Sequence, residues 1–260
     1  MRKNGPEVDP EKEVEGGQTS VGAFFETLRT VVIAVLIALG VRTFAYEPFN
    51  IPSGSMEPTL LIGDYLFVSK LSYGYSRYSI PFSPDLFGGR VFFTEPEIGD
   101  VAVFRTPRDN KTDYIKRIVG LPGDVIEVRE GVLHINGEAA KRELLLPSEL
   151  AEIDYPSAEG PVYLETLPNG RKHLIHEWLG DDGPADNWPP QTVQAGHVFA
   201  MGDNRDNSQD SRSIVGQIPF ENLIGRADVL FFSHDGQSAW WEFWRWPASI
   251  RFGRIGDAIE

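Results

Sequence analysis

The sequence predicts a mainly β protein, in which an N-terminal transmembrane helix is followed by an antiparallel β domain that carries an inserted second β domain. Three observations favour this fold class. One long apolar run lies near the N-terminus, and most of the remaining chain consists of short runs rich in Val, Ile and aromatic residues, separated by Gly and Pro. The third is a stretch rich in Pro, Asp and Glu that interrupts these runs. At 260 residues the chain can hold one or two domains with a substantial core.

The apolar run TVVIAVLIALGV covers residues 30–41, between Arg29 and Arg42. Alone it is shorter than the roughly 20 residues that span a bilayer, so a buried helix or a cleaved signal peptide would also fit it. The flanking residues that restore the length are Phe24, Phe25, Leu28, Phe44 and Ala45. An acidic stretch precedes the run and no clear small-residue cleavage site follows it. These features favour a retained anchor over residues 23–46, whose two arginines reach opposite interfaces.

Residues 1–22 form a polar tail with Pro and Gly, for which we expect disorder. More basic residues precede the anchor than follow it, since Arg42 stands alone just after the run. This asymmetry weakly places the tail in the cytoplasm and the rest of a single-pass protein on the other side of the membrane.

The short runs after the anchor predict strands at residues 65–70, 100–105, 114–119, 125–129, 132–135 and 198–201. Glu130 and Gly131 predict a hairpin turn, and Asn169 and Gly170 predict another more strongly. The second hairpin lies within the Pro-rich and acidic stretch. We therefore expect a catalytic β domain over residues 47–140 and 195–235, with a variable domain inserted at 141–194.

Composition narrows the class of function. The net charge of −14 argues against binding to nucleic acid, whose phosphates would be repelled. The chain has no cysteine, which excludes a thiol nucleophile and a disulfide framework. None of the five histidines stands in a recognisable catalytic setting, and no cofactor motif occurs.

A serine and a lysine carry the strongest chemical signal. Ser55 lies in IPSGSMEPTL and Lys116 in DYIKRIVGLPGD. A lysine acts as a general base only when burial or a nearby cation lowers its pKa, and it can then activate a serine hydroxyl. The two segments could equally be a turn and a solvated strand lysine. On a strand, Arg117 should point away from Lys116, whereas Tyr114 should share its face.

A dense polar run, MGDNRDNSQDSR, covers residues 201–212. It could be an exposed turn, because Asp, Asn and Ser bond readily to their own backbone. As a calcium loop it would start at Asp206, but Ser211 replaces the required Gly and Gln217 the bidentate Glu. We therefore expect no metal site and no cofactor.

Together, PSGSMEPTL, GDYLFVSK, YIKRIVGLPGD and GDNRDNSQDSR resemble the ordered motif series of bacterial type I signal peptidases, from the apolar segment to about residue 232. The resemblance implies the signal peptidase and SOS-repressor protease fold. It also implies that Ser55 is the nucleophile and Lys116 its general base. Ser53 would form the oxyanion hole with the Ser55 amide.

The same resemblance implies supporting roles for other positions. Ser208 would hold the lysine amine, and Asp210 and Arg212 would form an ion pair, although a self-bonded loop is the alternative. Asp203 and Arg205 also match family positions, and we interpret them as scaffold. The residues expected to line shallow substrate pockets, or else to be ordinary core, are Phe49, Ile51, Met56, Asp113, Tyr114 and Ile115.

The expected activity is that of a membrane-bound serine endopeptidase that removes leader peptides after small residues, at the outer face of the bacterial inner membrane. Its partners would be signal peptides of exported preproteins and the lipid bilayer, without metal or nucleic acid. One alternative is a self-cleaving SOS-type repressor, which would need a helical DNA-binding domain where this chain has its apolar run. Another is a non-catalytic, membrane-tethered β module.

Residues 236–260 form a segment rich in tryptophan, which contains AWWEFWRWPASIRFGRIG. Its aromatic residues are Trp240, Trp241, Phe243, Trp244 and Trp246, and its arginines are Arg245, Arg251 and Arg254. This composition suits the headgroup region of a bilayer, so we predict a membrane-interface segment. The alternative is that the rings cap the β core or mediate self-association.

Overall fold

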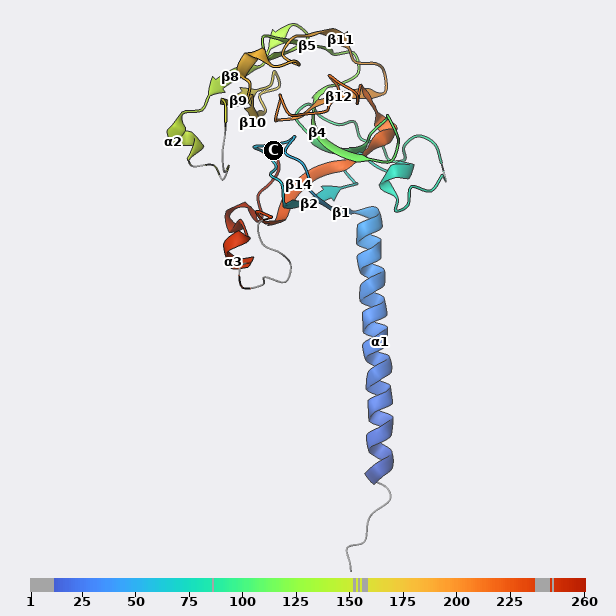
Figure 1. Cartoon of the computed structure of the whole chain (residues 1–260). Helices are drawn as coiled ribbons and strands as arrows, with labels where there is room; N and C mark the ends of the chain where they lie inside the picture. The colour runs from blue at the N-terminus through green and yellow to red at the C-terminus, as the bar shows by residue number, and fades with distance from the viewer. Residues whose placement is uncertain are drawn as a thin grey trace, which may run out of the picture. The chain divides into compact units, whose positions relative to one another are not determined.

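The computed structural model describes residues 12–85, 87–151, 153, 155, 159–236, 244 and 246–260, and it omits the side chains of residues 12–21, Asp182 and Trp246. The chain divides into two compact units, residues 1–42 and 43–260, which are described separately. Figure 1 shows the helix and the β unit that follows it.

The first unit consists of most of the helix α1 (Lys12–Phe44). Its segment Gly22–Phe44 has a mean hydropathy of 2.0 and is long enough to cross a membrane. The predicted anchor, 23–46, runs too far by two residues, because Tyr46 already belongs to strand β1 (Tyr46–Asn50). Glu47 precedes Pro48, and a residue before proline avoids the helical region, so the chain turns to strand here.

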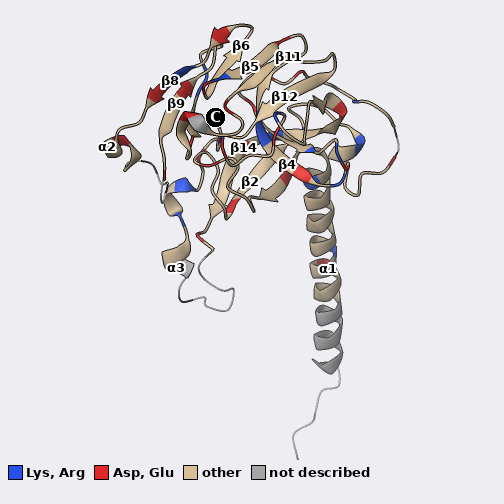
Figure 2. Ribbon diagram, turned by 45° about the horizontal axis from the view of Figure 1, so that its top comes forward, with Lys and Arg blue, Asp and Glu red and all other residues tan. Residues whose placement is uncertain are grey.

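The second unit is built on an antiparallel seven-stranded sheet with the order β1-β2-β14-β3-β4-β12-β13. The further strands of this sheet are β2 (Asp64–Ser69), β3 (Val101–Arg105), β4 (Asp113–Gly120), β12 (His197–Met201), β13 (Ile218–Pro219) and β14 (Leu223–Ser233). Acidic and basic positions are interspersed along the ribbon of this unit (Figure 2).

Two smaller sheets complete the unit, with the orders β11-β5-β6-β7 and β10-β9-β8. Their strands are β5 (Val125–Arg129), β6 (Val132–Ile135), β7 (Glu138–Ala139), β8 (Lys141–Leu144), β9 (Val162–Thr166), β10 (Lys172–His176) and β11 (Trp188–Thr192). The short helices are η1 (Arg77–Ser79), α2 (Pro147–Leu150), η2 (Gly180–Asp182), η3 (Phe220–Asn222), α3 (Trp246–Ser249) and η4 (Phe252–Arg254).

Both predicted hairpins are confirmed. Glu130 and Gly131 join β5 to β6 with positive φ angles of 49° and 72°, and Gly170 turns β9 into β10 with φ 86°. The mainly antiparallel β fold behind an apolar helix is confirmed as well. The sheets do not follow the predicted domain boundary at residue 141, because β11 pairs with β5 from the other side of that boundary.

The described core consists of three clusters of buried apolar side chains, each formed mainly by strands of these sheets. One cluster contains Ile51, Met56, Leu66 and Val103, and therefore lies beneath the segment that carries Ser55. Burial of this cluster holds the turn after β1 against the main sheet.

The described part of the C-terminal segment packs on the β unit. Ala258 bridges to Val229 and Ile250 to His234, both partners lying on or next to β14. Arg254 Nη2 donates to the buried Asp64 Oδ2 at 2.7 Å, and Arg251 lies 3.5 Å from the same carboxylate. These two arginines, predicted to face lipid headgroups, instead compensate a buried charge.

The structure describes only part of the aromatic residues of that segment. Trp240, Trp241, Phe243 and Arg245 lie outside the described residues, and Trp246 is described only as part of α3. Trp244 is 64% exposed. The membrane-interface role of this segment stays a prediction.

Candidate active site

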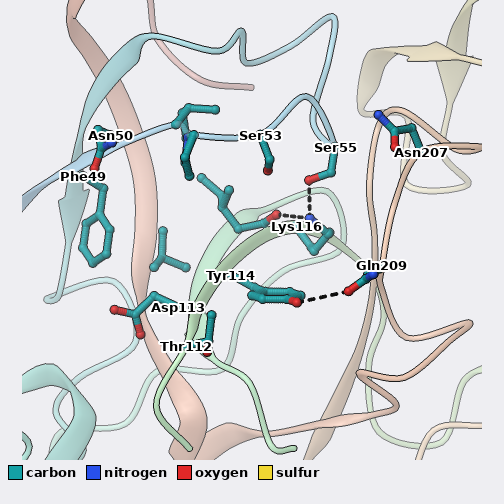
Figure 3. A pocket seen from close by; sticks show the side chains of 14 residues that line it. Phe49, Asn50, Ser53, Ser55, Thr112, Asp113, Tyr114, Lys116, Asn207 and Gln209 are labelled. Atoms are coloured by element: carbon teal, nitrogen blue, oxygen red, sulfur yellow. Dashed lines mark hydrogen bonds between the residues drawn. The ribbon is translucent and has the colours of Figure 1, made fainter. Parts of the chain in front are cut away.

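Ser55 and Lys116 meet in an open cleft (Figure 3). A hydrogen bond of 2.5 Å joins Lys116 Nζ to Ser55 Oγ, and Nζ also donates to the Ile115 carbonyl at 2.8 Å. Ser55 is 8% exposed and Lys116 only 3%. A second partner for the amine limits its rotation, so it stays directed at the hydroxyl.

Lys116 reaches the cleft because β4 alternates its side chains. Tyr114 shares the face of Lys116, with the ring centre 5.6 Å from Nζ, and Arg117 points to the opposite face. There Arg117 donates to Asp203 through Nε at 2.9 Å and Nη2 at 2.8 Å. Both predictions from the strand pattern are therefore confirmed, and the guanidinium cannot crowd the amine.

Burial changes the chemistry of the lysine. It lowers the pKa of Lys116 to about 8, although the charges of Asp210 and Asp203 oppose the shift. At neutral pH roughly one tenth of such an amine is neutral, compared with less than about a thousandth at an ordinary lysine pKa. A neutral amine at hydrogen-bond distance can accept the serine proton.

The cleft has a volume of about 410 Å³. Five of the six residues predicted to contact substrate line it: Phe49, Ile51, Asp113, Tyr114 and Ile115. Met56 does not, because its side chain is 0% exposed and lies in the core cluster beneath the turn. The structure therefore places Met56 in the core, and its contact with substrate stays a prediction.

Several lining residues were not anticipated, namely Asn50, Pro52, Val103, Thr112, Asn207 and Gln209. The Tyr114 hydroxyl donates to Gln209 Oε1 at 3.3 Å, which joins the polar loop to the cleft wall. Asn207 and Gln209 flank Ser208 in sequence, so their position in the polar run beside a predicted site residue was a signal that could have identified them.

Ser53 is exposed, and its side chain points into the cleft beside Ser55 (Figure 3). The turn that presents both serines is fastened by Asn204, a residue that the sequence motifs did not single out. Asn204 donates from its backbone amide to the Ser55 carbonyl at 3.2 Å, and from Nδ2 to the Gly54 carbonyl at 3.1 Å.

The polar run folds as a loop after β12 and holds the predicted ion pair. Arg212 donates to the buried Asp210 carboxylate at 3.1 Å and 2.9 Å. Arg212 also donates to the Arg205 carbonyl at 2.7 Å, so the pair closes the loop on itself. Burial alone would raise the pKa of Asp210, but Arg212 keeps that pKa below its ordinary value.

Ser208 lies close to the nucleophile but not in the predicted contact. A Cβ built on Gly202 would come within 2.3 Å of Ser208 Oγ and 2.4 Å of the Ser55 carbonyl, so the three residues crowd together. Within the described residues, Ser208 Oγ is buried and has no hydrogen-bond partner. Its role in holding the lysine amine stays a prediction.

Arg205 is part of the scaffold, as expected. Its guanidinium pairs with Glu165 on β9 through two hydrogen bonds, one of them 2.9 Å long, and His173 Nε2 lies 3.2 Å from the same carboxylate. Burial alone would raise the pKa of Glu165, but Arg205 and His173 hold it below its usual range. This ion pair therefore joins the polar loop after β12, which carries Arg205, to the β9–β10 hairpin.

A serine hydroxyl hydrogen-bonded to a buried amine, at an open cleft, is an arrangement that can carry out hydrolysis by a serine nucleophile with lysine as base. The family described as "Signal peptidase, peptidase S26" matches residues 24–232. The chain therefore belongs to the signal peptidase family S26, and it is a peptidase that processes signal peptides. The resemblance found in the sequence motifs is confirmed.

Individual relatives agree. Signal peptidase I of Rickettsia canadensis is 40% identical, over 87% of this chain and 90% of its own length. Signal peptidase I of Rickettsia prowazekii is also 40% identical, over 85% of this chain and 88% of its own. A crystal structure of a signal peptidase I from Enterococcus faecalis is 27% identical and covers 51% of this chain and 97% of that one, with a TM-score of 0.32.

Proposed function

We propose that this membrane-anchored peptidase cuts leader peptides from exported preproteins after small residues, with Ser55 as nucleophile and Lys116 as general base. The observation that carries the proposal is the 2.5 Å contact between Ser55 Oγ and a buried Lys116 amine. All five histidines lie in the described part of the chain, and none lines the cleft. Lysine is therefore the base within reach of the hydroxyl.

The reaction proceeds in two halves. The neutral Lys116 amine takes the proton from Ser55 Oγ as this oxygen attacks the scissile carbonyl carbon. The tetrahedral intermediate collapses to an acyl-enzyme, and the lysine ammonium returns its proton to the leaving amine, which is the N-terminus of the mature protein. Lys116 then takes a proton from the water that attacks the ester, and it returns this proton to Ser55 Oγ as the ester bond breaks, which frees both Ser55 and the leader.

The negative charge that forms on the carbonyl oxygen requires donors that are already in place. The Ser55 backbone amide and the Ser53 hydroxyl are the candidates, because both belong to the turn that presents the nucleophile to the cleft. Ile51, Tyr114 and Ile115 make the cleft walls largely apolar here. This environment favours small, uncharged side chains in the substrate before the scissile bond.

Replacing Ser53 by Ala should lower the turnover number by roughly 10² to 10³, because one oxyanion donor is lost while the nucleophile and its amide remain. The measurement is single-turnover cleavage of a leader peptide. Ser53→Thr keeps a hydroxyl and should lose much less activity. Equal rates for Ser53→Ala and the wild type would show that Ser53 is only a turn residue.

The function itself is tested with the purified full chain in detergent and a preprotein whose leader ends in a small residue. We expect one new N-terminus, directly after the leader, as read by mass spectrometry. Ser55→Ala should give no product, which separates the peptidase from a non-catalytic β module. Cleavage of the chain itself, in place of the preprotein, would favour the SOS-repressor type of activity.

We further propose that the chain crosses the bacterial inner membrane once, with the tail in the cytoplasm and the β unit on the outer face. Two points support this orientation. More basic residues precede the anchor than follow it, which favours a cytoplasmic tail. The leader of an exported preprotein becomes accessible to a peptidase on the outer side of the membrane. The native chain has no cysteine, so single cysteines report orientation cleanly. In intact spheroplasts, an impermeant maleimide should label Glu138→Cys, whereas Asn4→Cys should react only after lysis; the reverse pattern would contradict the proposed orientation.

A further inference from the structure

A group of three acidic side chains lies outside the residues that line the catalytic cleft. Glu177 follows β10, Asp186 precedes β11, and Asp206 belongs to the loop after β12. One carboxylate oxygen from each lies within 4.8 Å of the other two. The segment from Glu177 to Asp186 and the loop after β12 thus bring three carboxyl groups together.

The strongest indication that a partner is missing comes from Glu177. Its side chain is 1% exposed, and neither of its oxygens accepts a hydrogen bond from any residue that the structure describes. Burial accordingly raises the pKa of Glu177 to about 8. A buried carboxylate without hydrogen bonds is costly, so this group requires either a proton or a cation.

In each of the other two carboxylates, one oxygen accepts a hydrogen bond and the other has no partner among the described residues. Asp186 Oδ2 accepts from the Gly183 amide at 2.5 Å, and Asp206 Oδ2 accepts from the Leu179 amide at 2.8 Å. Their Oδ1 atoms are buried and have no partner within the described part of the chain. The backbone therefore orients each carboxylate and leaves one oxygen available to a ligand.

Neighbouring arginines do not supply the missing charge, because each already has an acidic partner. Arg205 pairs with Glu165 and Arg212 with Asp210. Arg142 lies 3.8 Å from Glu177 but bonds to Asp181 at 2.9 Å. With these pairs formed, the three acidic side chains retain a net excess of negative charge.

The geometry fits one class of cation better than others. All the side-chain ligands are oxygens, which hard cations prefer. Calcium takes six to eight oxygen ligands at roughly 2.3 to 2.6 Å in a flexible geometry, which suits three carboxylates that lie within 4.8 Å of one another, whereas magnesium demands a near-ideal octahedron at about 2.0 to 2.1 Å and gives up its water reluctantly. Gly183 contributes by its lack of a side chain, since a Cβ there would come within 2.0 Å of Asp206 Oδ1.

We propose that Glu177, Asp186 and Asp206 form a structural calcium site that fastens the 177–186 segment to the loop carrying Ser208 and Asp210. The site differs from the calcium loop considered for residues 206–217, which would draw all its ligands from one segment. It takes no part in bond cleavage, because the Ser55 and Lys116 pair lies in the separate cleft.

The test uses the full chain in detergent micelles, first stripped with EDTA and then titrated with CaCl₂ by calorimetry and thermal unfolding. At about 100 times the dissociation constant, calcium should raise the unfolding temperature by about 5 to 10 °C. The same concentration of MgCl₂ should give a clearly smaller shift. An equal shift with both ions would overturn the assignment to calcium.

Glu177→Gln is the informative variant, because it keeps the shape while removing a charge. In the absence of metal it should be at least as stable as the stripped wild type, since Glu177, with a pKa of about 8, is mostly protonated there and Gln is likewise uncharged. It should bind calcium at least tenfold more weakly and show little or no thermal shift. Glu143→Gln, an exposed position on β8, is the matched control and should respond to calcium like the wild type.

If the stripped wild type shows neither heat of binding nor a thermal shift with calcium, the proposal is wrong, and a proton or water satisfies Glu177 instead. The stripped enzyme should still cleave a leader peptide when assayed well below its unfolding temperature. Loss of cleavage there, restored by calcium, would contradict the purely structural role.

Discussion

Replacing Lys116 by Arg should reduce kcat/KM for a leader peptide by about 10⁴-fold or more. Arginine preserves the positive charge and much of the volume, but its guanidinium remains protonated at every accessible pH and cannot accept the Ser55 proton. Burial offers no remedy, because desolvation that lowers the pKa of Lys116 to about 8 leaves an arginine charged. The measurement is steady-state cleavage at several pH values.

Lys172→Arg is the control for this experiment, because Lys172 is exposed on β10 and outside the cleft. It should retain wild-type rates. Circular dichroism should show that Lys116→Arg remains folded, which excludes misfolding as the cause. A Lys116→Arg enzyme with turnover close to wild type would disprove the role of Lys116 as base.

Replacing Asp203 by Ala should destabilise the β unit by about 3 to 5 kcal/mol. Asp203 and Arg117 are both almost fully buried and joined by two hydrogen bonds, and Thr59 donates to the same carboxylate at 2.5 Å. Removal of the carboxylate leaves an uncompensated guanidinium in the interior. Guanidinium chloride denaturation measures the effect, with the exposed Glu138→Ala as the control.

The same pair sets a dependence of stability on pH. Burial alone would raise the pKa of Asp203, but Arg117 holds it below the ordinary value. The stabilisation is therefore complete above the unfolded-state pKa of about 4 and is lost as the pH falls below it. A wild-type and an Asp203→Ala protein of equal stability at pH 7 would mean that the interior tolerates the unpaired arginine.

The β fold was largely predictable from local patterns, because short Val- and Ile-rich runs bounded by Gly and Pro correspond to β2 to β6 and β12. The longest strand, β14, was not predicted. Arg226 and Asp228 interrupt its apolar pattern, yet they pair with each other at 2.9 Å on the partly exposed face. A run with charges in its middle resembles a loop until the pairing of those charges is known.

The candidate site, like the fold, was predictable only in part from the sequence. The motifs singled out Ser55 and Lys116, and the alternation of β4 predicted the opposite directions of Lys116 and Arg117. The contact of Asn204 with the Ser55 turn could not be predicted from a local sequence pattern, because it joins segments about 150 residues apart. Met56 was placed in the cleft by analogy, but the turn after Ser55 directs it into the core.

The C-terminal arginines illustrate a third kind of limit. Composition alone suggested that Arg251 and Arg254 face lipid. Asp64 lies far earlier in the sequence than these arginines. Its side chain is fully buried, so it requires a cation nearby, and this requirement is visible only in the folded structure. The composition of a segment shows which environments would suit it. It does not show which buried groups its residues contact in the folded protein.

The most direct test of the central claim, that a neutral Lys116 activates Ser55, is the pH dependence of kcat/KM for a leader peptide with the wild-type enzyme. This profile reports the pKa of the essential base in the free enzyme. Because the base must be neutral, activity should rise with pH as one proton leaves, with a midpoint near the Lys116 pKa of about 8. A midpoint near 6.5, typical of histidine, or a rate independent of pH between about 6 and 10, would contradict the account.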